Sequence, residues 1–548
     1  MKSPLPRRRL IPKWRPIATT LKTTEATSTD RRETKILSGD PDELDQAIAQ
    51  WRVTNAPGLL GEVLSFSVHH NLVNKVIDFG QEALQSGAAV TGVQARLIHD
   101  LGMEGGTPEL PFNEALLVSG KEVHPFQSQI RRLRALLRSA PDNPFALLDY
   151  AQLQAAVGKL ESAKRALRTA LSLAPNNRIV IRTAARFFVH VKQPDFAHYI
   201  IRRHSRTPFD PWLMASEIAL ADAAGIESSF LLKGKRLLLE QTKFSPAHLS
   251  ELAGVVAVSE LAVGNLKRAR EAQRKALLVP NDNVIAQAID QERFFGIQLD
   301  TPQVVKALAE SSEALVLQAW ARVMPKIVEQ HAQAWHTEEP FSSRPIQMLT
   351  TLYAYKGELE LAILWIKAGL LADPNDLGLL INLAFVQARL GQIAEAEVTI
   401  RKLRSLDLKF SEPFTKATEG LIAYQQHRFE AGDKLYDWAV LLFEKSSKPG
   451  LAAYCRLNQV FSALDYQHPG VNEIMRKAND AHTAHPTLDS AMLIKLRTAP
   501  DIADIKNVPQ EMRRLSQWMY DPTTNTLTER TGITAVGAKP LVILERKL

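Results

Sequence analysis

The feature that most constrains the fold is a residue pattern that recurs every 34 positions. Its clearest copy runs over residues 144–175. There, Leu147 and Ala151 fall on one face of a first predicted helix, Gly158 falls at a turn, and Ala163 lies on a second predicted helix. Small residues allow two antiparallel helices to approach closely, and glycine suits a helix C-terminus. The pattern therefore predicts a helix–turn–helix unit.

The same pattern returns further along the chain. A step of 34 residues takes Ala151 to Ala185, and a step of the same length takes Gly357 to Gly391. Each predicted helix is too short to be stable alone, so neighbouring units must cover its apolar face. We expect an all-α fold in which successive units stack side by side.

These residues resemble the tetratricopeptide repeat family, whose unit is a 34-residue pair of antiparallel helices. The resemblance implies an α-solenoid whose concave face, lined by the first helix of each pair, binds proteins or peptides. Lys192 stands where the family has its turn glycine. The resemblance is specific at 144–177, 343–376 and 377–410, moderate at 178–280, and weak at 57–90 and 411–490.

The pattern also predicts how the chain is organised. Within the last segment, we expect a helix over 512–520 and an extended tail over 522–548, which is rich in Thr, Val and Ile. The expected segments are a disordered basic Pro/Thr-rich tail (1–38), degenerate helical repeats (39–140), a first repeat array (144–282), an irregular helical connection (283–342), a second repeat array (343–490), and a C-terminal helix with an extended tail (491–548).

Positive charge is concentrated at the N-terminus. The whole chain has a net charge of +8, and residues 1–35 contain ten basic and three acidic side chains. A folded body that wraps nucleic acid usually carries basic charge across its surface, and here the body is close to neutral. The tail is a candidate second contact, with apolar anchors and arginines that would meet acidic protein, RNA, DNA or lipid headgroups. Its candidate residues are Arg7, Arg8, Arg9, Leu10, Ile11, Lys13, Trp14 and Arg15.

The resemblance also implies which residues face a partner. In the family, the partner-facing residues of the first helix recur at fourfold spacing. The cationic set Arg182 and Arg186 would hold an acidic peptide, whereas the family's carboxylate-gripping Lys/Asn arrangement is not reproduced. The expected concave-face residues are Gln152, Arg182, Arg186, His190, Gln347, Thr351, Tyr355, Ile381, Asn382, Phe385 and Arg389.

Catalytic chemistry has little support in the sequence. The chain lacks the phosphate-loop, dinucleotide, zinc-protease and serine-hydrolase motifs. Its one cysteine, Cys455, lies in an apolar predicted helix and is expected to be buried, and His482 and His485 are expected at the surface. We expect no catalytic residue, no cofactor and no metal.

Targeting signals are also missing from the pattern. No apolar run approaches the length of a membrane span, and the basic N-terminus is followed by no apolar signal core. A cytoplasmic location is therefore expected. Organellar import is the alternative: the Arg- and Thr-rich, acid-poor tail resembles a transit peptide, but its prolines disrupt the amphipathic helix that such a peptide needs.

The leading hypothesis is a non-enzymatic scaffold or adaptor that binds partner proteins or peptides. One alternative is a nucleic-acid-associated factor that uses residues 1–35 and the Arg182/Arg186 stripe. The other is an accessory subunit of a multi-protein enzyme complex. The sequence specifies neither the partner nor the oligomeric state.

Overall fold

The computed structural model divides the chain into two units. Unit 1 comprises Met1–Leu317 and Ala334–Ser342, and unit 2 comprises Gln318–Gln333 and Ser343–Leu548. The residues that the structure describes are 9–14, 41–55, 58–61, 63–64, 76, 78–80, 82–83, 126–139, 141–239, 244–291, 299–498, 518–521 and 526–529.

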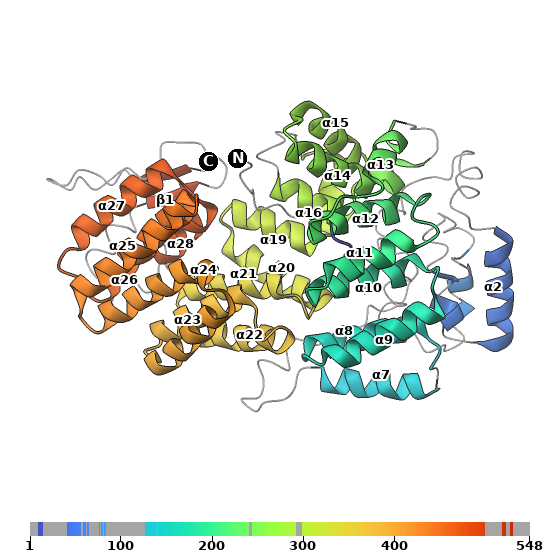
Figure 1. The fold of residues 1–548 in the computed structure, drawn as a ribbon, viewed down its shortest axis with the longest axis horizontal. Coiled ribbons are helices and arrows are strands. Elements are labelled where there is room, and N and C mark those ends of the chain that lie inside the picture. The colour runs from blue at the N-terminus through green and yellow to red at the C-terminus, as the bar shows by residue number, and fades with distance from the viewer. Residues whose placement is uncertain are drawn as a thin grey trace. The chain divides into compact units, whose positions relative to one another are not determined.

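Unit 1 is built from consecutive helices, most of which pack in antiparallel pairs (Figure 1). Helix α8 packs against α9, α10 against α11, and α14 against α15. The first helices of successive pairs, α10, α12, α14 and α16, also pack against one another in that order. The helices are α2 (Pro41–Thr54), α7 (Gln127–Ser139), α8 (Pro144–Ala156), α9 (Leu160–Leu173), α10 (Arg178–His190), α11 (Pro194–Arg203), α12 (Pro211–Ala224), α13 (Leu231–Leu237), α14 (Pro246–Ala262), α15 (Leu266–Ala276), α16 (Asp282–Asp290) and α18 (Pro302–Ala309).

Local chemistry sets the bounds of these helices. The Asn143 side chain accepts hydrogen bonds from the backbone N–H groups of Phe145 and Ala146, so it caps the N-terminus of α8. Gly158 ends the turn after α8 with a φ of 73°. Lys192 takes the equivalent place after α10 with a φ of 60°, so the chain adopts the left-handed turn even without glycine.

Unit 2 continues the paired arrangement. Two helices, α19 (Ser312–Ala321) and α20 (Pro325–Glu338), each have residues in both units. Helix α24 is interrupted at Asp407, whose φ is −157°. The remaining elements are α21 (Ser343–Lys356), α22 (Leu359–Ala372), α23 (Leu377–Arg389), α24 (Ile393–Gln425), α25 (Phe429–Lys445), α26 (Pro449–Asp465), α27 (Val471–Ala484), α28 (Leu488–Thr498), β1 (Trp518–Asp521) and β2 (Thr526–Glu529).

The predicted repeat chemistry is confirmed. Ala151 and Ala163, which lie on the two helices of the first well-formed pair, are both fully buried. Gly357 and Gly391, which the 34-residue step relates to each other, both lie at turns with positive φ values, as Gly158 does. Among the described helices, none combines the length and apolar character that crossing a membrane requires.

Two expectations about the fold of the termini differ from the structure. Residues 518–520, expected to end a helix, instead lie in β1, which pairs antiparallel with β2 so that Trp518 is opposite Glu529. Residues 9–14, expected in a disordered tail, are packed against the helices of unit 1. The rest of both termini lies outside the described residues, including 512–517, Arg7, Arg8 and Arg15.

Candidate peptide-docking site

Residues 9–14, here called the N-terminal segment, form the most informative contact in unit 1. The segment belongs to neither a helix nor a strand. Nevertheless Leu10 is only 2% exposed and Trp14 only 4% exposed. Burial at this level is typical of core residues, so two of the anchors expected to reach a partner are held by the chain itself.

Leu10 inserts into the apolar cluster formed by α12, α14 and α16. Met214, Leu252 and Val284 belong to the same cluster. Gly254 on α14 makes room for it, because a Cβ atom at this position would lie 2.6 Å from Leu10 Cδ1. A glycine in the middle of a helix is otherwise unfavourable, so its presence here fits a close approach by the segment.

Polar and charged contacts hold the rest of the N-terminal segment. Arg9 Nε donates to Asp222 Oδ2, at the C-terminal end of α12, over 2.6 Å. Asn283 on α16 donates from Nδ2 to the backbone oxygen of Ile11 at 3.2 Å. The Lys13 ammonium lies 3.1 Å from carboxylate oxygens of both Asp282 and Glu313.

Trp14 is held by the residues that follow α20. Its backbone N–H donates to Glu339 Oε1 at 3.1 Å, and its ring meets Phe341 edge-on at a centroid distance of 5.1 Å. Among the described residues, no hydrogen-bond acceptor lies within reach of the buried indole Nε1. The segment thus fits well at its backbone and less well at this one donor.

The Trp14 site also contains three of the expected concave-face residues. Arg186 on α10 forms a two-pronged ion pair with Glu339, with a shortest distance of 2.9 Å, and its guanidinium lies 5.4 Å from the Phe341 ring centroid. His190 packs edge-on against Phe341 at 4.8 Å. Gln152 on α8 donates to the backbone oxygen of Glu338, the residue before Glu339, at 2.8 Å. The tail candidates and the α10 candidates, derived separately from the sequence, therefore meet at one place.

Glu339 is the electrostatic centre of this site. Burial alone would raise the pKa of its carboxyl group. The Arg186 guanidinium, the backbone N–H of Trp14 and the Lys13 ammonium act in the opposite direction, and the net pKa of Glu339 is lowered. The carboxylate therefore stays charged at neutral pH and holds both Arg186 and the N-terminal segment.

The charged groups available around the N-terminal segment are acidic, whereas basic groups were expected there. Arg182, expected to help grip an acidic peptide, is buried and lies 2.7 Å from Glu251. It also donates to the backbone oxygen of Trp212 at 3.0 Å. Since Arg186 is likewise paired, neither arginine presents an unpaired cation. The charged groups that meet the segment are mainly the carboxylates of Asp222, Asp282, Glu313 and Glu339.

In unit 2, the expected concave-face residues mostly bond to neighbouring helices. The Tyr355 hydroxyl donates to the Tyr454 hydroxyl at 2.6 Å, and burial raises the pKa of Tyr355. Asn382 donates to Thr350 at 2.8 Å and to Thr351 at 3.4 Å. Three further placements complete the set: Gln347 donates to Asp376 at 2.9 Å, Arg389 lies 3.3 Å from Asp465, and Ile381 and Phe385 are half-buried.

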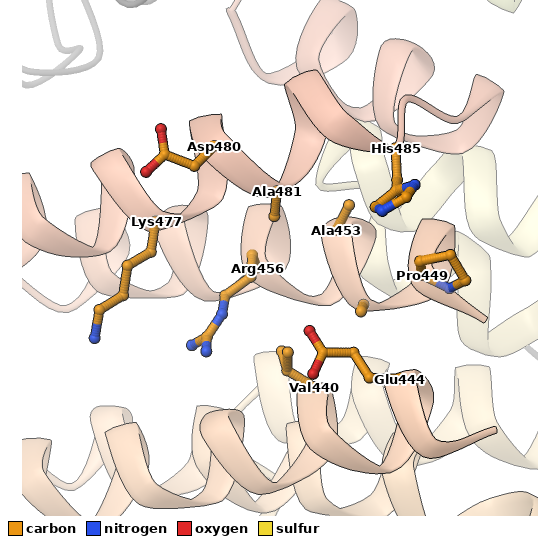
Figure 2. A pocket seen from close by; sticks show the side chains of 10 residues that line it. Val440, Glu444, Pro449, Ala453, Arg456, Lys477, Asp480, Ala481 and His485 are labelled. Atoms are coloured by element: carbon orange, nitrogen blue, oxygen red, sulfur yellow. The ribbon is translucent and has the colours of Figure 1, made fainter. Parts of the chain in front are cut away.

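Unit 2 also contains a hollow of about 500 Å³ between α25, α26 and α27, which the sequence did not reveal. Figure 2 shows Glu444 of α25 facing Arg456 of α26 across it, with Lys477 and Asp480 on α27. His485 lies at its edge. The lining mixes both signs of charge, so the hollow shows no clear preference for one kind of ligand.

Two residues that the sequence marked as possible carriers of chemistry, Cys455 and His482, lie in the interior of unit 2. Cys455 is buried as expected, and burial raises the pKa of its thiol to about 12. His482 was expected at the surface but is buried on α27. Within the described part of the chain, no group of three or more His, Cys, Asp or Glu side chains could hold a metal ion.

Several residues of the docking site escaped sequence analysis. Glu339 and Phe341 fall between repeats, where the 34-residue register assigns no role. Gly254 lies inside a helix of the register rather than at a turn, and that position is the one signal that could have marked it as a contact point. Asp282 and Glu313 look like ordinary acidic residues in the first turn of a helix.

Comparison with the models of known families finds the repeat at one place in the chain. Residues 146–177, which cover most of α8 and α9, match the model of the tetratricopeptide repeat. The sequence matches none of the curated proteins. Similar solved structures include yeast Tom70, with 12% identity over 78% of this chain and 97% of that chain and a TM-score of 0.27. They also include Naa15/Naa10 bound to HypK-THB, with 12% identity over 84% of this chain and 79% of that chain and a TM-score of 0.21. Residues 146–177 thus contain one matched tetratricopeptide repeat, and the consecutive helix pairs that follow it in unit 1 have the same paired-helix arrangement.

Proposed function

We propose that this protein is a non-enzymatic interaction scaffold that binds linear peptide segments of partner proteins. The binding surface would be the side of unit 1 formed by the stacked first helices α10, α12, α14 and α16, here called the first-helix face. One observation supports the proposal most directly: a linear segment of the chain itself is seated there. The segment contacts α12, α14, α16 and α19 in turn, and then the residues after α20. A row of stacked first helices offers such a ligand a separate contact for each of its residues.

The chemistry of this face suits a basic ligand with apolar anchors. Two long apolar side chains are buried, and two cationic side chains meet carboxylates. Buried aromatic anchors usually contribute most of the energy of such an interface, whereas exposed ion pairs contribute little. We therefore assign affinity mainly to the Leu10 and Trp14 positions and charge selectivity to the Lys13 position.

The nucleic-acid alternative loses part of its support. Phosphate binding needs cations that are available to neutralise it, and Arg182 and Arg186 are each paired with a buried carboxylate. The accessory-subunit alternative is a particular case of the scaffold proposal, because it differs only in the identity of the partner.

Affinity purification of the full chain from its native host tests the proposal. Asp282→Lys reverses a charge at the Lys13 position, to which we assign charge selectivity, and Glu271→Lys reverses an exposed charge on α15, away from the segment. Both are made in a chain whose own segment is released by Leu10→Asp and Trp14→Ala. Quantitative mass spectrometry should show partner proteins that fall several-fold in recovery with Asp282→Lys and are unchanged with Glu271→Lys. Equal recovery of every protein with both variants would contradict peptide binding on this face.

A further inference from the structure

We infer that the N-terminal segment is an intramolecular competitor, and that a linear basic–aromatic peptide from a partner protein displaces it from unit 1. The ligand class is defined by the segment: a bulky apolar residue, a tryptophan four positions later, and a lysine just before the tryptophan. This inference rests on the proposed function, since it assumes that the first-helix face binds peptides. It adds the sequence class of the ligand and a built-in control of access.

The segment is attached to the surface rather than woven into it. It adds no helix or strand to the fold, and in the sequence it is separated from α2 by residues 15–40. The surface beneath it is complete without it, because the cluster of α12, α14 and α16 packs its own leucines, valines and alanines together. Release of residues 9–14 would therefore expose a preformed site rather than unfold one.

Each position on the surface reads one feature of the ligand. Gly254 leaves space for the apolar side chain. Asp282 and Glu313 together surround one ammonium group, and Lys13 is only 9% exposed between them. Phe341, flanked by Arg186 and His190, receives the indole ring. These features differ from one another, so the site distinguishes the order of residues as well as their charge.

The resident segment is not an optimal occupant. The buried indole N–H of Trp14 has no acceptor among the described residues, and a buried unsatisfied donor weakens binding. The Arg9–Asp222 pair is largely exposed, with 46% and 64% of the two side chains accessible, and such pairs contribute little. A partner peptide that satisfies the indole N–H, or makes a better contact at the Arg9 position, would compete successfully.

Fluorescence anisotropy with a labelled peptide of residues 7–16 tests the inference. A tethered competitor acts at an effective concentration on the order of millimolar. The wild-type chain should therefore bind the added peptide only weakly. The full-length variant Leu10→Asp/Trp14→Ala, whose own segment cannot dock, should bind it at least about tenfold more tightly. A control peptide with the same two substitutions should bind neither protein.

A second form of the protein controls for misfolding of that variant, because it releases the segment without substituting Leu10 or Trp14. A protease site inserted between residues 20 and 30 substitutes neither a residue of the segment nor any residue named at the docking surface. Cleavage abolishes the tether, so the added peptide should now bind at least about tenfold more tightly than to the uncut protein. The inference is overturned if neither release nor cleavage strengthens binding, or if the control peptide binds as well as the authentic one.

The scaffold proposal and the competitor inference fail in different ways. If Asp282→Lys lowers partner recovery while the peptide shows no gain on release, the face binds partners but the segment is not their competitor. If the peptide binds the released protein while partner recovery is insensitive to Asp282→Lys, the competitor inference stands and the scaffold proposal fails.

Discussion

The attachment of the N-terminal segment predicts an unusual response to Leu10→Asp. Leu10 lies in the same apolar cluster as Leu252 on α14, and the two side chains are 2% and 0% exposed. A carboxylate at either position would have to ionise in an apolar environment or take up a proton there, which costs several kcal/mol. If burial alone decided the outcome, the two substitutions would destabilise unit 1 equally.

The segment can detach from unit 1 without unfolding it, whereas α14 cannot. Leu10→Asp can leave the cluster when the segment detaches, so its cost cannot exceed the free energy of docking. With an effective concentration on the order of millimolar and an intrinsic dissociation constant of tens of micromolar, docking is worth about 2 kcal/mol. Leu252→Asp has no such limit, because Leu252 can leave only if α14 unfolds.

Urea denaturation followed by far-ultraviolet circular dichroism separates these outcomes. Leu10→Asp should lower the free energy of unfolding by no more than about 2 kcal/mol, and Leu252→Asp should lower it by at least about 4 kcal/mol or prevent folding. Hydrogen exchange of the Trp14 amide, which donates to Glu339, should become fast in the Leu10→Asp protein. Equal losses in the two variants would show that the segment is an integral part of the core, and the competitor inference would be wrong.

Three further predictions concern titratable groups. The lowered pKa of Glu339 means that its contribution to stability is present above the unfolded value of 4.5 and lost as pH falls through the lowered pKa. The protection factor of the Trp14 amide, measured by hydrogen exchange, should therefore fall as Glu339 takes up a proton, and Glu339→Gln should remove this pH dependence. Burial lowers the pKa of His482 to about 4, so unit 2 should lose about 3 kcal/mol between pH 6.5 and pH 4 as the unfolded chain takes up the proton first; in urea titrations, His482→Gln should flatten this dependence. Because burial raises the pKa of Cys455 to about 12, its thiol should not react with a disulfide reagent at pH 8 until urea unfolds the chain, and fast reaction of the native protein would contradict the buried placement.

The fold was predictable because its determinants are local. An alanine at each facing position, a glycine at a left-handed turn and an asparagine before a helix act within a few residues of themselves. The sequence therefore predicted the α8–α9 pair and its turn at Gly158 correctly. It could not predict the strand at residues 518–521. The short apolar pattern there is compatible with a helix or a strand, and it is the pairing with residues 526–529 that decides for the strand.

The docking site was less predictable because its contacts are long-range. Trp14 and Glu339 are 325 residues apart in sequence, and no periodicity links them. The family register places these residues on the first helices, but it does not say which of them form hydrogen bonds or ion pairs with neighbouring repeats. Tyr355 and Asn382 bond to adjacent helices, whereas Arg186 and His190 flank the ring that receives Trp14.

The charge asymmetry of the chain takes on a different meaning once these contacts are known. A strongly basic tail on a nearly neutral body suggests a search for an acidic partner elsewhere. In unit 1, however, the neutral average conceals a row of carboxylates along first helices, and Lys13 already lies between two of them. The acidic partner of at least part of the tail is therefore the chain itself. It follows that raising the salt concentration should weaken the exposed Arg9–Asp222 pair, whereas the buried Lys13 pair and the burial of Leu10 and Trp14 continue to hold the segment on the first-helix face.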